Sequence, residues 1–384
     1  MLRRAARHPT WAARSSFEDP GRALLGRAGI TVGGTAPFDT VVHDERVFAR
    51  VLRDGSLGLG EAYVDGWWDS PAVDQTLSRI LGARLAEHLG KSWRETAGVL
   101  AARIVNLQSR RRAPQVAERH YDIGNDMYRA MLDRRLVYTC GYWKRASDLE
   151  EAQEAKLNLI CRKLRLEAGM RLLDLGCGFG GLAKYAAENY DVRVTGITLS
   201  RQQLELGREL CAELPVDLRL QDYRDACGIY DRVVSVGILE HVGPRNYRTH
   251  MEVVDRCLAP GGISLFHTIT NPLSETVGDP WITRYIFPNA SPPSVAQLAR
   301  AMEGRFLIDD LHAFGSDYDR TLMAWYRNFV SAWPKLKESY SERFYRTWTY
   351  YLLMCAAAFR TRAFDLVQAV MTRPDTPHPD CRLT

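Results

Sequence analysis

The sequence predicts an α/β protein, with a doubly wound, Rossmann-like sheet and a smaller, mainly helical N-terminal domain. First, strand-like apolar segments alternate with helix-like ones over residues 149–269, which is typical of parallel sheets with right-handed crossovers. Second, residues 170–181, MRLLDLGCGFGG, have the pattern of a buried strand, a glycine-rich turn and the start of a helix. Third, a chain of 384 residues is long enough for two domains.

Three regions are expected along the chain. Residues 1–20 are Arg-rich without a long apolar core, so we expect a poorly ordered terminus rather than a secretory signal, and composition leaves a transit peptide open. Residues 21–113 are expected to form an N-terminal lipid- or membrane-docking domain with its linker. Pro114 marks the start of the catalytic domain, residues 114–384.

Composition narrows the class of protein. The net charge of +5 permits an anionic partner without requiring one. The eight cysteines form no C-x-x-C pair, so we expect no metal site. A disulfide framework is not expected in a chain of this length either, which indicates a reducing, cytoplasmic setting. No stretch of about 18 apolar residues predicts a membrane span.

The N-terminal region predicts short elements. Residues 38–43 favour an extended segment, 48–52 a short helix, and 55–69, GSLGLGEAYVDGWWD, a loop-rich aromatic segment. Residues 92–109 have the apolar spacing of an amphipathic helix and are followed by the basic cluster Arg110–Arg112. This cluster fits an anionic membrane surface or a solvated linker, and the sequence leaves both open.

The catalytic domain predicts a regular succession of elements. Strands are expected at residues 171–175, 192–197, 216–220, 230–236 and 263–269, with a closing strand at 364–371. Helices are expected at residues 149–164, 200–212, 247–258, 322–333 and 341–360. Residues 271–293 form an insertion with five prolines, and insertions of this length usually serve a site or a lid.

The ends of the predicted strands indicate a nucleoside site, because ligands of open α/β sheets bind beyond the carboxyl ends of the strands. The turn after the first strand has the spacing G-x-G-x-G, which does not favour a dinucleotide pyrophosphate. Its D-x-G-x-G-x-G pattern resembles the turn of S-adenosylmethionine (SAM) methyltransferases. The candidate cofactor residues at three successive strand ends are Asp174, Gly176, Gly178, Gly180, Thr198, Leu199, Gln203, Gln221, Asp222 and Tyr223.

Two further candidates follow the fourth and fifth strands. Glu240 and His267 are expected to project into the same crevice, although each alone would equally suit a helix start or a buried core histidine. His241 is expected to face away or to cap its helix. Upstream, Tyr121 could close over a nucleoside, and Cys140 fits either a core position or a site contact.

Several long motifs, in order, resemble the cyclopropane-fatty-acyl-phospholipid synthases and their relatives, the mycolic acid cyclopropane synthases. They are HYDIGND, YTCGYW, LLDLGCGFGGLA, VGILEHVGP, DPWITRYIFPN, DYDRTLMAWY and YYLLMCAAAFR, and with GSLGLGEAYVDGWWD they cover nearly the whole chain. One departure is Phe179, where the family commonly has Trp, and we expect it to change little.

The resemblance implies transfer of a methylene group from SAM to the cis double bond of an unsaturated acyl chain in a membrane phospholipid. It implies that Tyr121, Gly176, Gly178, Thr198, Gln203, Asp222 and Tyr223 hold the cofactor. It also implies a bound bicarbonate, held by Cys140, Glu240, His267, Ile269 and Tyr318. Cys355 matches a cysteine proposed as catalytic in the family, but its alanine- and aromatic-rich helix ranks it lower.

The implied chemistry suits these residues. Methyl transfer to an alkene leaves a carbocation that aromatic faces stabilise, and a mild base must then remove a proton so that the ring closes. A bicarbonate beside Glu240 implies unusual protonation of that carboxyl group. The resemblance also implies a homodimer and a cytoplasmic protein peripherally associated with the anionic inner face of the membrane; no nucleic-acid partner is expected.

Three other functions stay open at this point. One is a related SAM-dependent lipid methyltransferase that makes methyl-branched chains, which the shared motifs do not separate from a cyclopropane synthase. The second is a SAM methyltransferase for a small molecule or RNA, although no RNA-binding motif is visible. The third is a non-catalytic lipid-binding protein, which the presence of Glu240 and His267 disfavours.

Overall fold

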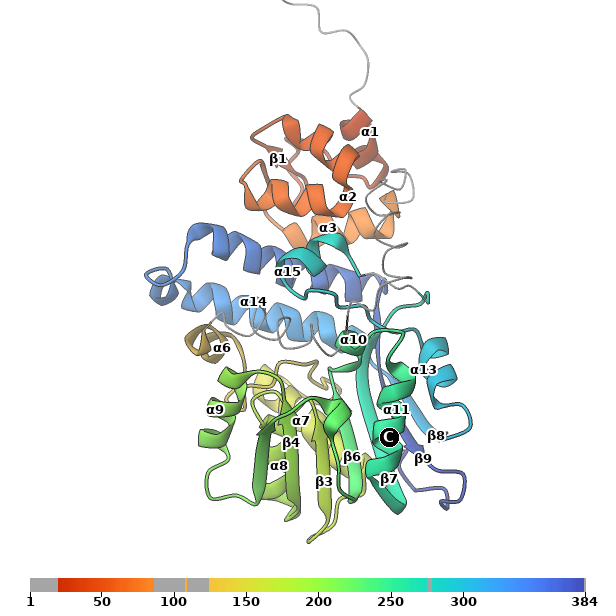
Figure 1. Cartoon of the computed structure of the whole chain (residues 1–384). Helices are drawn as coiled ribbons and strands as arrows, with labels where there is room; N and C mark the ends of the chain where they lie inside the picture. Colours follow the sequence, from red (N-terminus) through yellow and green to blue (C-terminus); the bar gives the residue numbers. More distant parts are fainter. Residues whose placement is uncertain (1–19, 86–107, 109–123, 275–277, 383–384) are drawn as a thin grey trace, which may run out of the picture.

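A mixed, seven-stranded sheet forms the centre of the computed structural model, which describes residues 20–85, 108, 124–274 and 278–382 (Figure 1). The strand order is β5-β4-β3-β6-β7-β9-β8. The first five strands in this order are parallel, whereas β9 pairs antiparallel with β7 and β8 pairs antiparallel with β9. The strands are β3 (Arg171–Leu175), β4 (Arg193–Thr198), β5 (Val216–Leu220), β6 (Tyr230–Val236), β7 (Leu258–Thr270), β8 (Leu307–Ala313) and β9 (Asp365–Thr372). This confirms the predicted Rossmann-like fold.

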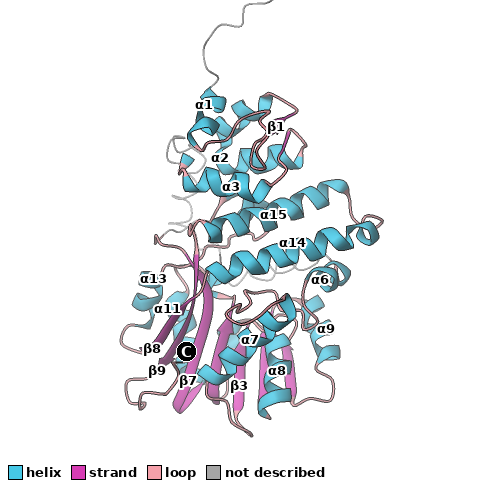
Figure 2. Ribbon diagram, turned by 180° about the vertical axis from the view of Figure 1, so that it is seen from behind, coloured by secondary structure: helices cyan, strands magenta, loops and turns pink. Residues whose placement is uncertain are grey.

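Helices cover both faces of the sheet. α7 (Leu149–Lys163) and α8 (Gly181–Tyr190) lie on one face, and α11 (Tyr247–Cys257) and α13 (Val295–Met302) on the other (Figures 1 and 2). Consecutive strand residues therefore enter different cores: Val233 packs with the α11 side and Val234 with the α7 side. This explains why the central strands are continuous apolar runs rather than alternating ones.

Shorter elements complete this part of the chain. They are α6 (Asn125–Met131), α9 (Arg201–Leu210), the 3₁₀ turn η2 (Tyr223–Asp225), α10 (Leu239–Val242) and α12 (Pro280–Tyr285). The five parallel strands lie within two residues of their predicted positions, except that β7 begins five residues earlier. The sequence analysis missed α12, α13 and β8 altogether.

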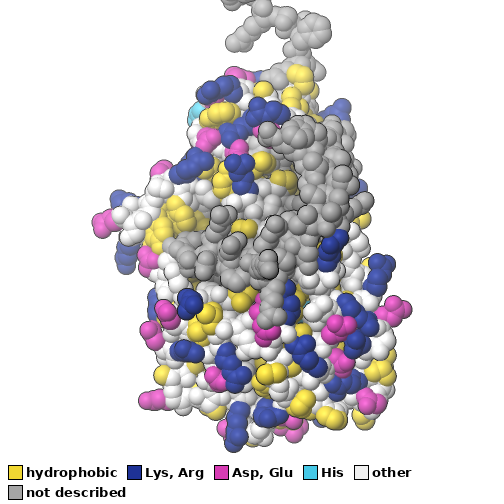
Figure 3. All heavy atoms as spheres, in the orientation of Figure 1, with side chains coloured by type: hydrophobic (Ala, Val, Ile, Leu, Met, Phe, Trp, Pro, Cys, Tyr) yellow, Lys and Arg dark blue, Asp and Glu magenta, His cyan; other side chains and the backbone are white. Residues whose placement is uncertain are grey.

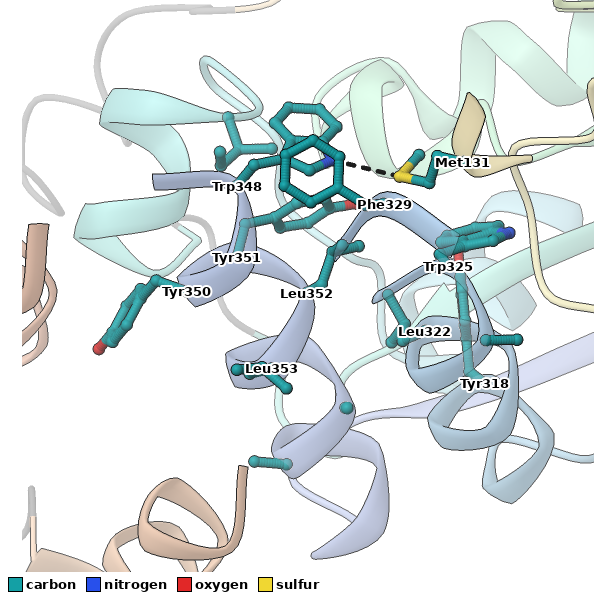
Figure 4. Close-up of a cluster of buried hydrophobic side chains, with 14 of the residues drawn as sticks. Met131, Tyr318, Leu322, Trp325, Phe329, Trp348, Tyr350, Tyr351, Leu352 and Leu353 are labelled. Atoms are coloured by element: carbon teal, nitrogen blue, oxygen red, sulfur yellow. Dashed lines mark hydrogen bonds between the residues drawn. The ribbon is translucent and has the colours of Figure 1, made fainter. Parts of the chain in front are cut away.

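A long helical hairpin lies between the sheet and the N-terminal helices. It consists of α14 (Ser316–Leu336), which continues through Pro334, and α15 (Glu342–Arg360). Large buried side chains pack between the two helices, as Figure 4 shows, and the Trp348 indole N–H donates to the sulfur of Met131 from α6 at 3.2 Å. The hairpin thus joins a large aromatic core to the part of the sheet where ligands are expected.

The N-terminal helices α2 (Arg46–Val64) and α3 (Val73–Gly82) pack on α15, and α1 (Pro20–Arg27) packs on α2 (Figure 1). Val47, Phe48 and Leu77 belong to the same hydrophobic cluster as Trp348. Arg346 and Arg360 of α15 pair with carboxylates of the N-terminal region, Asp69 at 2.8 Å and Asp74 at 2.6 Å. The predicted division at residue 113 lies outside the described residues and stays a prediction.

The prediction of a loop-rich segment at residues 55–69 is wrong for most of its length. Residues 46–64 form α2, which is kinked at Gly55 (φ 57°), and two-residue strands β1 (Val41–Val42) and β2 (Trp68–Asp69) pair beside it. The glycines of this helix serve packing instead: a Cβ at Gly60 would lie 2.4 Å from the indole of Trp281.

Two further points concern segments relevant to membranes. Within the described ranges, no helix is both long and apolar enough to cross a bilayer. The predicted helix at 92–109, apart from Gln108, and the cluster Arg110–Arg112 lie outside those ranges.

Candidate active site

A cavity of about 220 Å³ opens at the carboxyl ends of β3, β4, β5 and β6, and we call it the strand-end cavity. Nine of the ten cofactor residues predicted from strand ends line it: Asp174, Gly176, Gly178, Thr198, Leu199, Gln203, Gln221, Asp222 and Tyr223. Gly180 is not among its lining residues, and Tyr121 lies outside the described residues. The structure therefore brings together groups from three separate strand ends.

The glycine turn presents bare backbone to this cavity. Gly176 and Gly178 have φ values of 87° and 55°, which L-residues with side chains rarely adopt. The amides of Gly176 and Cys177 donate to the Ile197 carbonyl oxygen at 3.0 and 2.9 Å, which fixes the turn against β4. Gly180 is the left-handed residue that precedes α8 and packs against Cys211 instead, so its part is structural.

Polar groups at the next two strand ends are mostly engaged with one another. The hydroxyl of Thr198 donates to Gln203 Oε1 at 3.0 Å. Both carboxylate oxygens of Asp222 accept hydrogen bonds from the guanidinium of Arg224, at 2.8 and 2.7 Å. The Tyr223 hydroxyl is buried and has no hydrogen-bond partner in the described ranges, and burial raises its pKa to about 12, so it is a neutral group that can meet a ligand.

Several lining residues escaped the sequence analysis: Gln108, Tyr138, Thr139, Lys156, His241, Phe287 and Asn289. The expectation that His241 faces away is wrong, since it lines the cavity and its ring meets Phe287 edge to face at 5.6 Å. A signal for Lys156 was present, because it stands one turn from Ala152 and Ile160 on the apolar face of a predicted helix. A lysine at such a position calls for an explanation.

A closed polar cluster lies beside the cavity, at the ends of β6 and β7. Glu240, at the start of α10, accepts a hydrogen bond from the Ile269 amide to Oε1 at 2.7 Å, while its Oε2 is buried with no hydrogen-bond partner among the described residues. Burial raises the pKa of this carboxyl group to about 7. Glu240 and Ile269, which lie 29 residues apart in the sequence, are therefore in direct contact.

His267 belongs to the same cluster, two residues before Ile269 on β7. Its Nδ1 accepts from the side-chain amide of Gln368 on β9 at 3.2 Å, and within the described part of the chain its buried Nε2 has no partner. Burial, reinforced by Lys156 and Lys163, holds its pKa well below the usual range, so the ring is neutral. With this amide orientation the proton is on Nε2. We call Glu240, His267, Ile269 and Gln368 the Glu240 cluster.

Cys140 and Tyr318 are held on adjoining segments. Thr321 Oγ1, one turn along α14 from Tyr318, accepts from the Gly141 amide at 3.0 Å and lies 3.9 Å from Cys140 Sγ. Burial raises the pKa of the Cys140 thiol well above its usual range, so it is a protonated thiol. Phe314, just before α14, has its ring 5.7 Å from that of His267, which links the segment to the Glu240 cluster.

Cys355 occupies a different setting, on α15 one turn after Tyr351. Burial raises the pKa of its thiol to about 12, which leaves almost no nucleophilic thiolate near neutral pH. Tyr351 shares a hydrogen bond of 2.9 Å with Tyr138, a lining residue of the strand-end cavity. A catalytic role for Cys355 stays a prediction of low rank.

The proline-rich insertion closes over the site. Its ends meet where the Asn271 amide donates to the Pro293 carbonyl oxygen at 2.9 Å. The Ser291 amide donates to the carbonyl oxygen of Glu240 at 2.8 Å, and Phe287 and Asn289 line the strand-end cavity. The insertion thus contributes to both parts of the site.

Comparisons with known proteins agree with this architecture. The chain is 52% identical, over 91% of its length and 92% of the relative's, to the cyclopropane-fatty-acyl-phospholipid synthase of Escherichia coli K12. The structure of the cyclopropane synthase MmaA2 from Mycobacterium tuberculosis superposes with a TM-score of 0.64 at 30% identity, covering 67% of this chain and 97% of that one. CmaA1, a mycolic acid cyclopropane synthase solved with SAH and CTAB, gives 0.63 at 31% identity, covering 67% and 97%.

A family model described as mycolic acid cyclopropane synthetase matches residues 108–369, which include the strand-end cavity, the Glu240 cluster and the helical hairpin. With the close similarity to the Escherichia coli enzyme, this assigns the chain to the mycolic acid cyclopropane synthetase family of SAM-dependent methyltransferases.

Proposed function

We propose that the protein transfers a methylene group from SAM to the cis double bond of an unsaturated acyl chain in a phospholipid, giving a cyclopropane ring. One observation carries the proposal: a cavity with a glycine turn adjoins a closed cluster of unpartnered polar atoms. One short segment belongs to both, because Ile238 lines the cavity and Glu240 follows two residues later. A second segment, Tyr138 and Thr139, lines the cavity just before Cys140.

The strand-end cavity fits SAM. Gly176 and Gly178 leave room for a ligand against the backbone, and Tyr223 and Asp174 each present a buried polar atom without a partner. In our proposal these residues hold the cofactor, with Thr198 and Gln203 beside them. The bound cofactor would supply an electrophilic methyl group on a sulfonium. The chain's part is to orient that group toward the alkene and to exclude water.

The Glu240 cluster fits a small anion that carries its own proton, which is the chemistry of bicarbonate. His267 Nε2–H can donate to it, and Glu240 Oε2 can donate when protonated or accept when ionised. The ion would supply a mild base. In our proposal Glu240 and His267 position it, with the amide of Ile269, the thiol of Cys140 and Tyr318 completing its surroundings.

The direct test mixes the purified protein, SAM and vesicles of a monounsaturated anionic phospholipid, followed by mass spectrometry of the fatty acids. We expect a gain of one CH₂ with loss of the alkene signal. A gain of CH₂ with the alkene retained would replace the proposal by a methyl-branching activity. No change of mass, with SAM binding intact, would move the search to another acceptor.

The membrane arrangement forms a second part of the proposal. On the face shown in Figure 3, basic and acidic side chains of the described residues are interspersed, so that face offers no extended patch of one sign. We propose that Arg110–Arg112, which lie outside the described residues, provide the contact with anionic lipid at the inner face of the membrane. Their replacement by Ala should weaken co-sedimentation with anionic vesicles, and unchanged sedimentation would contradict it.

The assembly state belongs to the same proposal. A homodimer, which the family resemblance implies, is checked by sedimentation velocity of the purified full chain. A single species at the monomer mass across the micromolar range would remove it.

A further inference from the structure

Lys156 is a buried cation inside the strand-end cavity. Its side chain is 1% exposed, and its ammonium group donates to Thr139 Oγ1 at 3.0 Å. An ammonium group has three N–H donors, and Thr139 is its one hydrogen-bond acceptor among the described residues. Burial lowers the pKa of Lys156 to about 8, and nearby acids oppose that shift. The cavity therefore holds a charge that its own walls only partly satisfy.

Asp174 is the matching acid in the same cavity. It ends β3, is 1% exposed, and its Oδ1 is buried without a hydrogen-bond partner. Lys156 and Asp174 influence one another electrostatically, yet among the described residues no ion pair of 4 Å or less joins them. Burial raises the pKa of Asp174 to about 7, so the cavity holds a lysine and a partly ionised carboxyl group that do not pair directly. Such an arrangement is costly unless a ligand with both charges completes it.

We propose that Lys156 and Asp174 bind the zwitterionic amino-acid end of SAM, Lys156 its α-carboxylate and Asp174 its α-ammonium group. The inference rests on the proposed placement of SAM in the strand-end cavity. Both side chains flank the glycine turn, since Gly176 and Gly178 line the same cavity. Thr139 orients the lysine, and α7 supports this segment again through Gln153, whose amide donates to the Thr139 carbonyl oxygen at 2.8 Å.

A structural reading of the same contacts competes with this proposal. In this reading, the hydrogen bond from Lys156 only holds Thr139, and the neighbouring Cys140, in position against α7. The two readings differ in one respect: a fastening role affects every ligand of the cavity equally, whereas a charge receptor distinguishes ligands by their amino-acid end. The test therefore compares ligands that share the adenosine part.

The experiment is isothermal titration calorimetry of the full-length protein with three probes. S-adenosylhomocysteine has the whole amino-acid end, decarboxylated SAM lacks the carboxylate, and 5′-methylthioadenosine lacks both charges. We expect K156M to raise the Kd of S-adenosylhomocysteine about 10- to 100-fold and to change the Kd of 5′-methylthioadenosine by less than about twofold. The affinity for decarboxylated SAM should not change in K156M and should fall in D174N, because this probe keeps only the ammonium group of the amino-acid end.

Lys163 provides a matched control on the same helix. It is also fully buried, but its ammonium pairs with Asp310 at 2.9 Å and it does not line the cavity. K163M should lower thermal stability and leave the affinity ratio of S-adenosylhomocysteine to 5′-methylthioadenosine unchanged. K156R, which keeps the charge, should recover part of that ratio. Because the ratio is internal to each variant, a partial loss of folded protein does not affect it.

Three results would overturn the inference. An equal loss of affinity for all three probes in K156M would leave Lys156 with a purely structural role. Unchanged affinities together with an altered bicarbonate requirement would assign its charge to that anion instead. Failure of S-adenosylhomocysteine to bind the unaltered protein would contradict the placement of the cofactor itself, and the inference, which rests on that placement, would be lost with it.

Discussion

The strand-end cavity and the Glu240 cluster are neighbours built on different principles. The cavity is open, is formed by consecutive strand ends, and hydrogen-bonds most of its polar side chains internally, as Asp222 does with Arg224. The Glu240 cluster is closed, joins β7 to a strand from the end of the chain, and leaves Glu240 Oε2 and His267 Nε2 without partners. Buried polar atoms are seldom left unpaired, and among the described residues both regions contain such atoms: Asp174 Oδ1 and the Tyr223 hydroxyl in the cavity, and Glu240 Oε2 and His267 Nε2 in the cluster. The two regions therefore differ in access rather than in the presence of unpaired groups.

The largest expected effect separates the two regions by function. Glu240→Gln keeps the shape of the side chain and removes its ability to ionise. Because Glu240 does not line the strand-end cavity, we expect activity to fall about 10²- to 10⁴-fold while the Kd of S-adenosylhomocysteine changes less than about twofold. The assay is fatty-acid mass spectrometry beside calorimetry. A parallel loss of cofactor affinity would show that the two regions do not act separately.

A second prediction uses the pH dependence of stability. The pKa of Glu240 is raised by burial from 4.5 to about 7, so its contribution is fully present below pH 4.5 and is lost as pH rises through 7. Gln at this position does not titrate. Between pH 5 and 8 the unaltered protein should therefore lose about 2 kcal/mol of unfolding free energy relative to E240Q, measured by urea denaturation. A difference that stays constant with pH would mean that Glu240 keeps an ordinary pKa.

A third prediction concerns the backbone of the cavity. Gly178→Ala introduces a Cβ at a residue with φ of 55° that lines the cavity, and Gly169→Ala does the same at φ of 82° in a loop outside it. Both changes should cost about 1 kcal/mol of stability. Only G178A should raise the Kd of S-adenosylhomocysteine, about tenfold. Equal binding by the two variants would remove the glycine turn from the cofactor site.

The smallest expected effect lies outside both regions. Cys355→Ala should change activity less than about twofold, because a thiol with a pKa of about 12 is a poor nucleophile. The rate is measured under the conditions used for E240Q. A loss comparable to that of E240Q would make Cys355 part of the chemistry and would extend the reactive region onto α15.

The contrast also explains which parts could be predicted. Each strand end is a local pattern, and the parallel topology brings those ends to one edge, so Gly176, Thr198 and Tyr223 could be found from sequence. Gln368 could not, because it reaches His267 through β9, an antiparallel addition with no local signal for its neighbour. His241 failed for another reason: α10 has four residues, too few for a periodic face.

The glycines of α2 explain why its second half was predicted as a loop. Residues 55–60 contain three glycines, which ordinarily indicate a loop, yet only Gly55 has a conformation that breaks the helix. Gly58 and Gly60 are helical and admit close neighbours, with Trp281 against Gly60. That contact joins segments more than 200 residues apart, and local propensity carries no record of it.

The stacking of the N-terminal helices on α15 bears on recombination between relatives. The family model matches from residue 108 onward, so the helices at residues 20–82 precede the matched segment. A chimera that exchanged this preceding part would replace Tyr63, whose ring packs on that of Tyr350 at 5.3 Å. It would also separate Arg346 from Asp69 and Arg360 from Asp74, although Arg360 would keep Asp319 at 2.8 Å. A functional graft would therefore have to supply matching partners for these outer side chains of α15.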